Sequence, residues 1–116
     1  MNEQMFKHRT KQLALEAIKV LEDLPRTRTA DVLGKQLLRA ATSVGANYRA
    51  ACRGKSRADV IAKLGVVEEE ADETSYWIEL LREARLFPTE KLERLAAESN
   101  EILAMTVASI KTLRRS

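Results

Sequence analysis

Cysteine, histidine, proline and aromatic residues are all scarce in this chain of 116 residues. Its single cysteine, Cys52, excludes an intrachain disulfide, and we interpret it as a small packing residue. Its single histidine, His8, excludes a di-iron site, which needs a Glu-x-x-His pair on each of two helices. No apolar run approaches the ~20 residues that span a bilayer, and the first residues are too charged for a secretion signal. We therefore expect a cytoplasmic protein with no membrane partner.

With only two prolines and four glycines, the chain has few points at which a helix must end. Ala, Glu, Leu, Lys and Arg dominate, and this composition is typical of helical proteins. Three short segments that contain Pro or Gly interrupt the helical pattern, at Leu24–Thr29, Arg53–Ser56 and Leu86–Thr89. We predict four helices, over residues 4–23, 29–52, 57–85 and 89–114. Thr29 is the predicted N-cap of the second helix and Ser56 that of the third.

Each predicted helix has apolar residues at spacings of three and four and polar residues on the opposite side, which is the pattern of an amphipathic helix. Four such helices joined by short connections favour an all-α, antiparallel, up-down-up-down four-helix bundle. The length of 116 residues suffices for one domain with its own core, so we expect a single domain over residues 1–116.

Polar side chains also line the second and third helices at helical spacing. Glu70 and Glu73 share a line with Trp77, so this line is expected to face partly inward, where carboxylates are costly unless they meet donors. We predict that donors on the second helix satisfy them, in a structural polar seam made of Arg39, Ser43, Asn47, Glu70, Glu73 and Trp77. Gly45 and Gly65 are expected to let the helix backbones approach closely.

The net charge of +3 is unevenly distributed. Residues 1–67 carry 13 Lys and Arg against 6 Asp and Glu, a net charge of +7, whereas residues 68–116 carry 7 against 11, a net charge of −4. A cluster opposed only by Asp59 contains the candidate nucleic-acid-binding residues Arg49, Arg53, Lys55, Arg57 and Lys63. These cations could neutralise phosphates or pair with carboxylates of a neighbouring subunit. Because exposed aromatic residues are not interleaved with them, we expect any nucleic acid to bind through its backbone, with a steep salt dependence.

The acidic residues allow an alternative hypothesis, a Mg²⁺-dependent enzyme similar to the all-α nucleoside triphosphate pyrophosphatases. Such a site would draw on the acids of Glu68–Glu73 together with Glu90, Glu93, Glu98 and Glu101. The acids of the fourth helix also have the spacing of an ordinary solvated face, and Trp77 would crowd the site. We therefore predict that the protein is not an enzyme and that it has neither a cofactor nor a metal site.

The stretch Leu37–Leu81 resembles the four-helix bundle proteins first noticed as reading frames within intervening sequences of bacterial large-subunit ribosomal RNA genes. The residues that carry the resemblance are Leu38–Arg39, Ala41–Asn47, Ser56–Asp59, Lys63–Leu64, Glu70–Thr74 and Tyr76–Ile78. Leu13–Pro25 also fits, so the resemblance spans nearly the whole chain, although the fourth helix matches only in length and pattern. The sequence departs from many relatives at Ala50, where they carry an acid.

The resemblance implies a left-handed bundle that assembles as a ring-shaped homopentamer and has no established enzymatic activity. Related accessory proteins of diversity-generating retroelements form basic pentamers that bind nucleic acid and a reverse transcriptase. The partners that the resemblance implies are therefore further copies of the chain, RNA or DNA, and a reverse transcriptase. Apolar residues outside the core stripes are candidates for the subunit interface, namely Leu15, Ile18, Ile61, Val66 and Tyr76.

Overall fold

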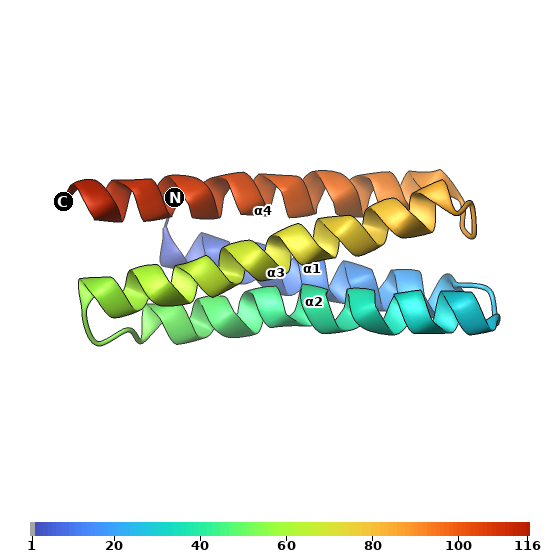
Figure 1. Ribbon diagram of the computed structural model, residues 1–116, viewed down its shortest axis with the longest axis horizontal. Helices are drawn as coiled ribbons and strands as arrows, with labels where there is room; N and C mark the ends of the chain where they lie inside the picture. The colour runs from blue at the N-terminus through green and yellow to red at the C-terminus, as the bar shows by residue number, and fades with distance from the viewer. Residues whose placement is uncertain (1) are drawn as a thin grey trace.

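The computed structural model describes residues 2–116, the side chain of Thr89 excepted, and within this range every regular element is a helix (Figure 1). The elements are α1 (Glu3–Asp23), α2 (Arg28–Cys52), α3 (Arg57–Glu83) and α4 (Thr89–Arg115). They form an antiparallel up-down-up-down bundle about 47 Å long and 20 Å wide, which confirms the predicted fold class. None of the described helices combines the length and apolarity needed to cross a membrane.

Side-chain caps explain where the first three helices begin. The side-chain oxygen of Asn2 accepts a hydrogen bond from the Met5 amide, and that of Ser56 accepts one from the Asp59 amide, at 2.7 and 3.1 Å. The prediction that Thr29 caps α2 is wrong. Thr27 is the cap and accepts a hydrogen bond from the Ala30 amide at 3.1 Å, because the turn after Pro25 ends two residues earlier than the sequence pattern indicated.

The core runs along the axis of the bundle and receives fully buried side chains from every helix. Its largest members include Phe6, Leu13, Leu37, Ile78, Leu92 and Ile102. Four buried hydroxyl groups lie among them and donate hydrogen bonds to main-chain carbonyls, so burying them leaves no polar atom unsatisfied. These groups belong to Thr10, Thr74, Ser99 and Thr106.

Gly45 and Gly65 have different environments. A Cβ added at Gly45 would lie 3.2 Å from Oγ1 of Thr10, so the missing side chain lets α1 approach α2 closely there. A Cβ added at Gly65 would meet no atom within 4 Å, so the prediction that this glycine allows a close helix approach is wrong. Gly65 therefore lowers the helix propensity of α3 without a compensating contact.

Substituting alanine at two glycines is expected to have opposite effects on stability. Gly65→Ala should raise the free energy of unfolding by about 0.5–1 kcal/mol, because alanine favours a helix interior and meets open space. Gly54→Ala should lower it by about 1 kcal/mol or more, because the new Cβ would clash with Val60. Urea unfolding of both variants measures the two changes, and a destabilised Gly65→Ala variant would contradict the description of this position.

One end of the bundle is less completely filled than its middle. Helix α1 has 21 residues, whereas α3 and α4 each have 27, and α4 extends beyond the start of α1 at the end that carries the C-terminus (Figure 1). A small separate hydrophobic cluster of Ala51, Leu64 and Ile110 lies there. Beside it is an open cavity of about 540 Å³, lined in part by Phe6 and Leu113.

Candidate nucleic-acid interface

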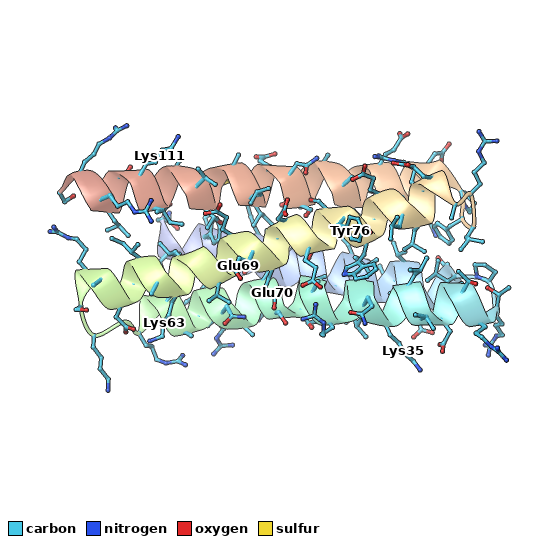
Figure 2. All side chains as sticks on the ribbon, in the orientation of Figure 1. Lys35, Lys63, Glu69, Glu70, Tyr76 and Lys111 are labelled. Carbon is cyan, nitrogen blue, oxygen red and sulfur yellow. The ribbon has the colours of Figure 1, made fainter. Side chains whose placement is uncertain are left out.

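The up-down topology gathers positive charge at one end of the bundle. The start of α1, the α2–α3 connection and the end of α4 all lie at this end, where Figure 2 labels Lys63 and Lys111. Segments 2–11, 49–63 and 111–116 together contain 11 Lys and Arg residues but only two acids, Glu3 and Asp59. We call the following residues the basic end: Lys7, Lys11, Arg49, Arg53, Lys55, Arg57, Lys63, Lys111, Arg114 and Arg115.

Only half of the basic end forms a cluster in the sequence, around the α2–α3 connection. Lys7 and Lys11 of α1, and Lys111, Arg114 and Arg115 of α4, are distant from that cluster in the sequence. A signal for them was nevertheless available, because an up-down-up-down bundle necessarily brings the first turn of helix 1 and the last turn of helix 4 to the connection between helices 2 and 3.

The five predicted cations have different local partners. Lys63 forms an ion pair with Asp59, with Nζ and Oδ2 2.8 Å apart, and the same Oδ2 accepts a hydrogen bond from the Lys55 amide at 2.9 Å. The hydrogen bond from Lys63, followed by that from the Lys55 amide, holds the pKa of Asp59 below its usual value. Arg57 donates a hydrogen bond to the main-chain oxygen of Ser116 and so connects the start of α3 to the end of α4.

Arg49 and Arg53 instead line an open groove of about 800 Å³ between α1 and α2. The α1 side of this groove, which we call the α1–α2 groove, carries Lys7, His8 and Lys11. Its lining contains no acidic side chain among the described residues, so basic groups face each other across it. The small side chains of Ala14, Gly45 and Ala46 also belong to the lining and leave room for a ligand between the charged groups. The groove is therefore suited to an anion.

The acids of α4 and α3 bind two different arginines. Arg9 of α1 makes two hydrogen bonds with Glu98, from Nε at 2.9 Å and from Nη2 at 3.0 Å, and one with Glu101 at 2.9 Å. These hydrogen bonds raise the pKa of Arg9 and lower that of Glu101. Glu98 and Glu101 lie on a solvent-accessible face, with Glu101 59% exposed, but they also tie α4 to α1, a role that the sequence did not predict. Nowhere in residues 2–116 do three His, Cys, Asp or Glu side chains gather in a way that could hold a metal ion.

The predicted polar seam divides into two parts. Arg39 forms ion pairs with Glu73 and, at 3.5 Å, with Glu70, and Nε1 of Trp77 donates a hydrogen bond to Glu73 at 3.3 Å. The side chain of Glu70 is only 16% exposed, whereas that of Arg39 is 49% exposed, so the ion pairs lie at the margin of the α2–α3 packing. Three of the six predicted residues are therefore in contact across the two helices, and Trp77 joins them through Glu73 within α3.

The other two members of the predicted seam form hydrogen bonds within α2. Ser43 donates to the carbonyl of Arg39 at 2.7 Å, and Asn47 donates to the carbonyl of Ser43 at 2.8 Å. A hydroxyl or amide group on a helix can reach the carbonyl one turn earlier, and this local partner is always close by. Residue type and spacing alone did not distinguish this bond from one across the helix interface.

The sequence of residues 3–108 matches the family model described as 23S rRNA-intervening sequence protein. The chain belongs to this family. The resemblance drawn from the motifs of α2 and α3 is thereby confirmed. No curated protein matches the chain significantly.

A similar protein of known crystal structure supports the fold of this member of the 23S rRNA-intervening sequence protein family. It is a crystal structure of a protein with unknown function from the S23 ribosomal protein family of Bacteroides thetaiotaomicron. The two chains are 35% identical and superpose with a TM-score of 0.87, over 96% of this chain and 99% of the other. The similarity therefore covers the whole bundle, including α4, which the motifs did not reach.

Two isosteric substitutions are expected to separate the roles of the seam acids. Burial is the main cause that raises the pKa of Glu70, whereas the hydrogen bond from Arg39 is the main cause that lowers the pKa of Glu73. Ionised Glu73 therefore stabilises the fold above its usual pKa of 4.5, and this contribution is lost as the pH falls through its lowered value. The raised pKa of Glu70 has the opposite sign, so the folded state favours its protonated form and loses that advantage as the pH rises through the raised value.

We therefore expect Glu73→Gln to destabilise the protein at about pH 7 and to have a smaller effect at about pH 2, because the contribution of ionised Glu73 is lost as the pH falls through its lowered pKa. Glu70→Gln is expected to cost less than Glu73→Gln at about pH 7, because the amide removes a carboxylate whose ionisation burial disfavours. Urea unfolding at the two pH values measures both effects. Equal losses in the two variants at neutral pH would contradict the assignment of opposite pKa shifts.

Proposed function

We propose that this 23S rRNA-intervening sequence protein is a non-enzymatic protein that binds nucleic acid through the phosphate backbone at its basic end. The observation that carries the proposal is that the ten Lys and Arg of the basic end outnumber the two acids in the segments that meet there, Arg9 being bound to Glu98 and Glu101. Such a concentration of charge attracts a polyanion and gains free energy when condensed counterions are released from the phosphates. Further copies of the chain in an oligomer would multiply this field.

The aromatic residues argue for binding without sequence preference. Of the five aromatic side chains only Tyr76 is exposed, and Figure 2 shows it toward the other half of the bundle from Lys63 and Lys111. Phe6 is buried near the basic end and packs against Tyr48, with ring centroids 4.4 Å apart. Because Phe6 is buried and Tyr48 is partly buried against it, little aromatic surface is available at the basic end for stacking on bases, and RNA and DNA should bind similarly.

Fluorescence anisotropy with labelled single-stranded RNA and DNA tests this proposal. If about four phosphates are neutralised, the association constant should fall about 50-fold between ~50 and ~200 mM salt. Little difference between oligonucleotides of unrelated sequence is expected, because phosphates carry no base information. The absence of binding to either nucleic acid at the lower salt concentration would overturn the proposal.

We also propose that the chain associates with copies of itself in a closed ring, the homopentamer that the family resemblance implies. Exposed apolar residues support this proposal, since all but Val32 lie on two helices that do not touch each other: Met5, Leu15 and Ile18 on α1, and Val66 and Tyr76 on α3. An interface that joins two different faces of the same chain generates a ring when its rotation closes.

Light scattering of the purified protein tests self-association. We expect an oligomer at micromolar concentration, and the double variant Leu15→Glu/Tyr76→Lys should be smaller, because it places charges on both proposed contact faces. Val32→Glu provides a control, since Val32 is equally exposed but lies on α2. A wild-type monomer at micromolar concentration would overturn the proposed ring without affecting the nucleic-acid proposal.

A further inference from the structure

We infer that the α1–α2 groove holds a single-stranded segment of nucleic acid, with successive phosphates lying between the cations of the two helices. This inference rests on the proposed function, which it makes more specific. The basic end as a whole could bind any polyanion on its surface, whereas the groove selects by shape. The ligand class is therefore a phosphodiester chain that is not part of a duplex.

The positions of the cations fit an extended strand. Lys7 and Lys11 are one helical turn apart on α1, and Arg49 and Arg53 are one turn apart on α2. Residues four apart in a helix are separated by about 6 Å along its axis, which is close to the distance between successive phosphates of an extended strand. Gly45 lies against Thr10 and Tyr48 against Phe6, so Lys7 is level with Arg49, whereas Lys11 and Arg53 lie about one turn away on opposite sides. One phosphate can thus lie between cations of both walls and each of its neighbours beside one cation, and Arg can donate two parallel hydrogen bonds to a phosphate.

The shape of the groove excludes a duplex. Packed helices have axes only about 8–10 Å apart, so the furrow that runs along the surface between α1 and α2 is narrower than a double helix, and only a single strand could lie within it. Gly45 brings the two helices together, since an added Cβ would lie only 3.2 Å from Thr10. Ala14 and Ala46 then keep the groove open above this close approach, because their side chains fill little of it. A duplex could touch only the charged rims.

The chemistry of the lining favours a backbone over a base. Among the described residues the groove is lined by no Phe, Tyr or Trp, so His8 supplies the one ring in it on which a base could stack. The side chains of Gln4 and Thr42 also line it and can donate hydrogen bonds to phosphate or ribose oxygens. The bases are therefore expected to point outward, which agrees with binding that does not depend on sequence.

A substitution that fills the groove without changing its charge tests whether the strand lies in the groove or is only attracted to the positive charge of the basic end. Ala46 is exposed on α2 and lines the groove, and leucine is well tolerated in helices, so Ala46→Leu should fold normally and occupy the space for the strand. Ala62→Leu is the matched control, because Ala62 is exposed on α3 near the same end but does not line the groove. Circular dichroism verifies that both variants are folded.

The probes are a fluorescein-labelled oligouridylate and an RNA duplex of the same length, measured by anisotropy at ~50 mM salt. The wild type should bind the single strand more tightly than the duplex. Ala46→Leu should weaken single-strand binding about tenfold, which corresponds to one lost phosphate contact, and leave duplex binding unchanged. The control Ala62→Leu should bind both probes as the wild type does.

The other possible outcomes distinguish a failure of the groove inference from a failure of the proposed nucleic-acid binding. If Ala46→Leu binds the single strand as tightly as the wild type, or weakens both probes equally, the strand does not lie in the groove, although the basic end still binds nucleic acid. If Ala46→Leu lowers the oligomeric state in light scattering, a second copy of the chain covers the groove and the inference is overturned. If the wild type binds neither probe, the proposed function itself fails.

Discussion

Replacing both Arg49 and Arg53 by Gln is expected to weaken single-stranded nucleic-acid binding roughly 60-fold at ~50 mM salt. Both side chains line the α1–α2 groove, and each lost phosphate contact removes the counterion release that it caused. The dependence of the logarithm of the association constant on the logarithm of salt concentration should become shallower by about 1.4. Anisotropy titrations at several salt concentrations measure both quantities.

The control for this result is Arg28→Gln/Lys35→Gln. It removes the same charge from exposed positions of the same helix, but at the opposite end of the bundle, where Figure 2 labels Lys35. We expect a weakening of only a few-fold, because these charges are separated from the basic end by more than a Debye length of about 8–10 Å. Equal losses in the two double variants would mean that net charge and not the basic end determines binding.

Ile78→Ala is expected to lower the free energy of unfolding by about 3–4 kcal/mol. The Ile78 side chain is fully buried in the C-terminal part of α3, so its removal loses apolar burial and leaves a cavity that the surrounding helices fill only in part. This is a large fraction of the 5–15 kcal/mol that usually separates a folded domain from its unfolded state. Urea unfolding at neutral pH measures the change.

Val32→Ala provides the comparison, because Val32 is 54% exposed on α2 and its truncation leaves no cavity. Its free energy of unfolding should remain within about 0.5 kcal/mol of the wild type. A similarly small effect of Ile78→Ala would contradict the placement of Ile78 in the core. Because self-association adds to apparent stability, both variants should be compared at the same protein concentration.

The sequence predicted the helices well because their determinants are local. Apolar residues at spacings of three and four mark each buried face, and Pro25, Gly54 and Pro88 lie in the connections. The cap of α2 was misplaced because Thr27 and Thr29 are equally good caps by residue type. Which of them begins the helix depends on the turn that follows Pro25, where the Thr27 amide donates to the Pro25 carbonyl.

Interactions between distant segments were harder to predict. Arg9 and Glu98 are 89 residues apart, and no local pattern indicates that they form two hydrogen bonds. The Arg39 contacts with Glu70 and Glu73 were expected because a cation on one polar line and two acids on another, next to a tryptophan, have few other ways to be satisfied. At Gly65 the sequence predicted a close contact between helices that does not exist, because residue type alone does not reveal whether a neighbouring helix is close.

The basic end illustrates what topology adds to sequence. Its cations come from three separate segments, and only the cluster near the α2–α3 connection is visible as a continuous run. The groove between α1 and α2 depends further on the small residues Ala14, Gly45 and Ala46, whose shared role appears only when the two helices are packed.

The ion pairs of Arg9 with Glu98 and Glu101 hold α1 to α4 at the weakest helix contact of the bundle. The packing between these two helices is the least extensive of the four neighbouring pairs, whereas that between α2 and α3 is the most extensive. Partial opening should therefore begin with the detachment of the first helix, while the central hairpin stays intact. In native-state hydrogen exchange, the amides of α1 should then lose protection before those of α2 and α3, and a weaker Arg9–Glu98 attachment would accelerate that exchange.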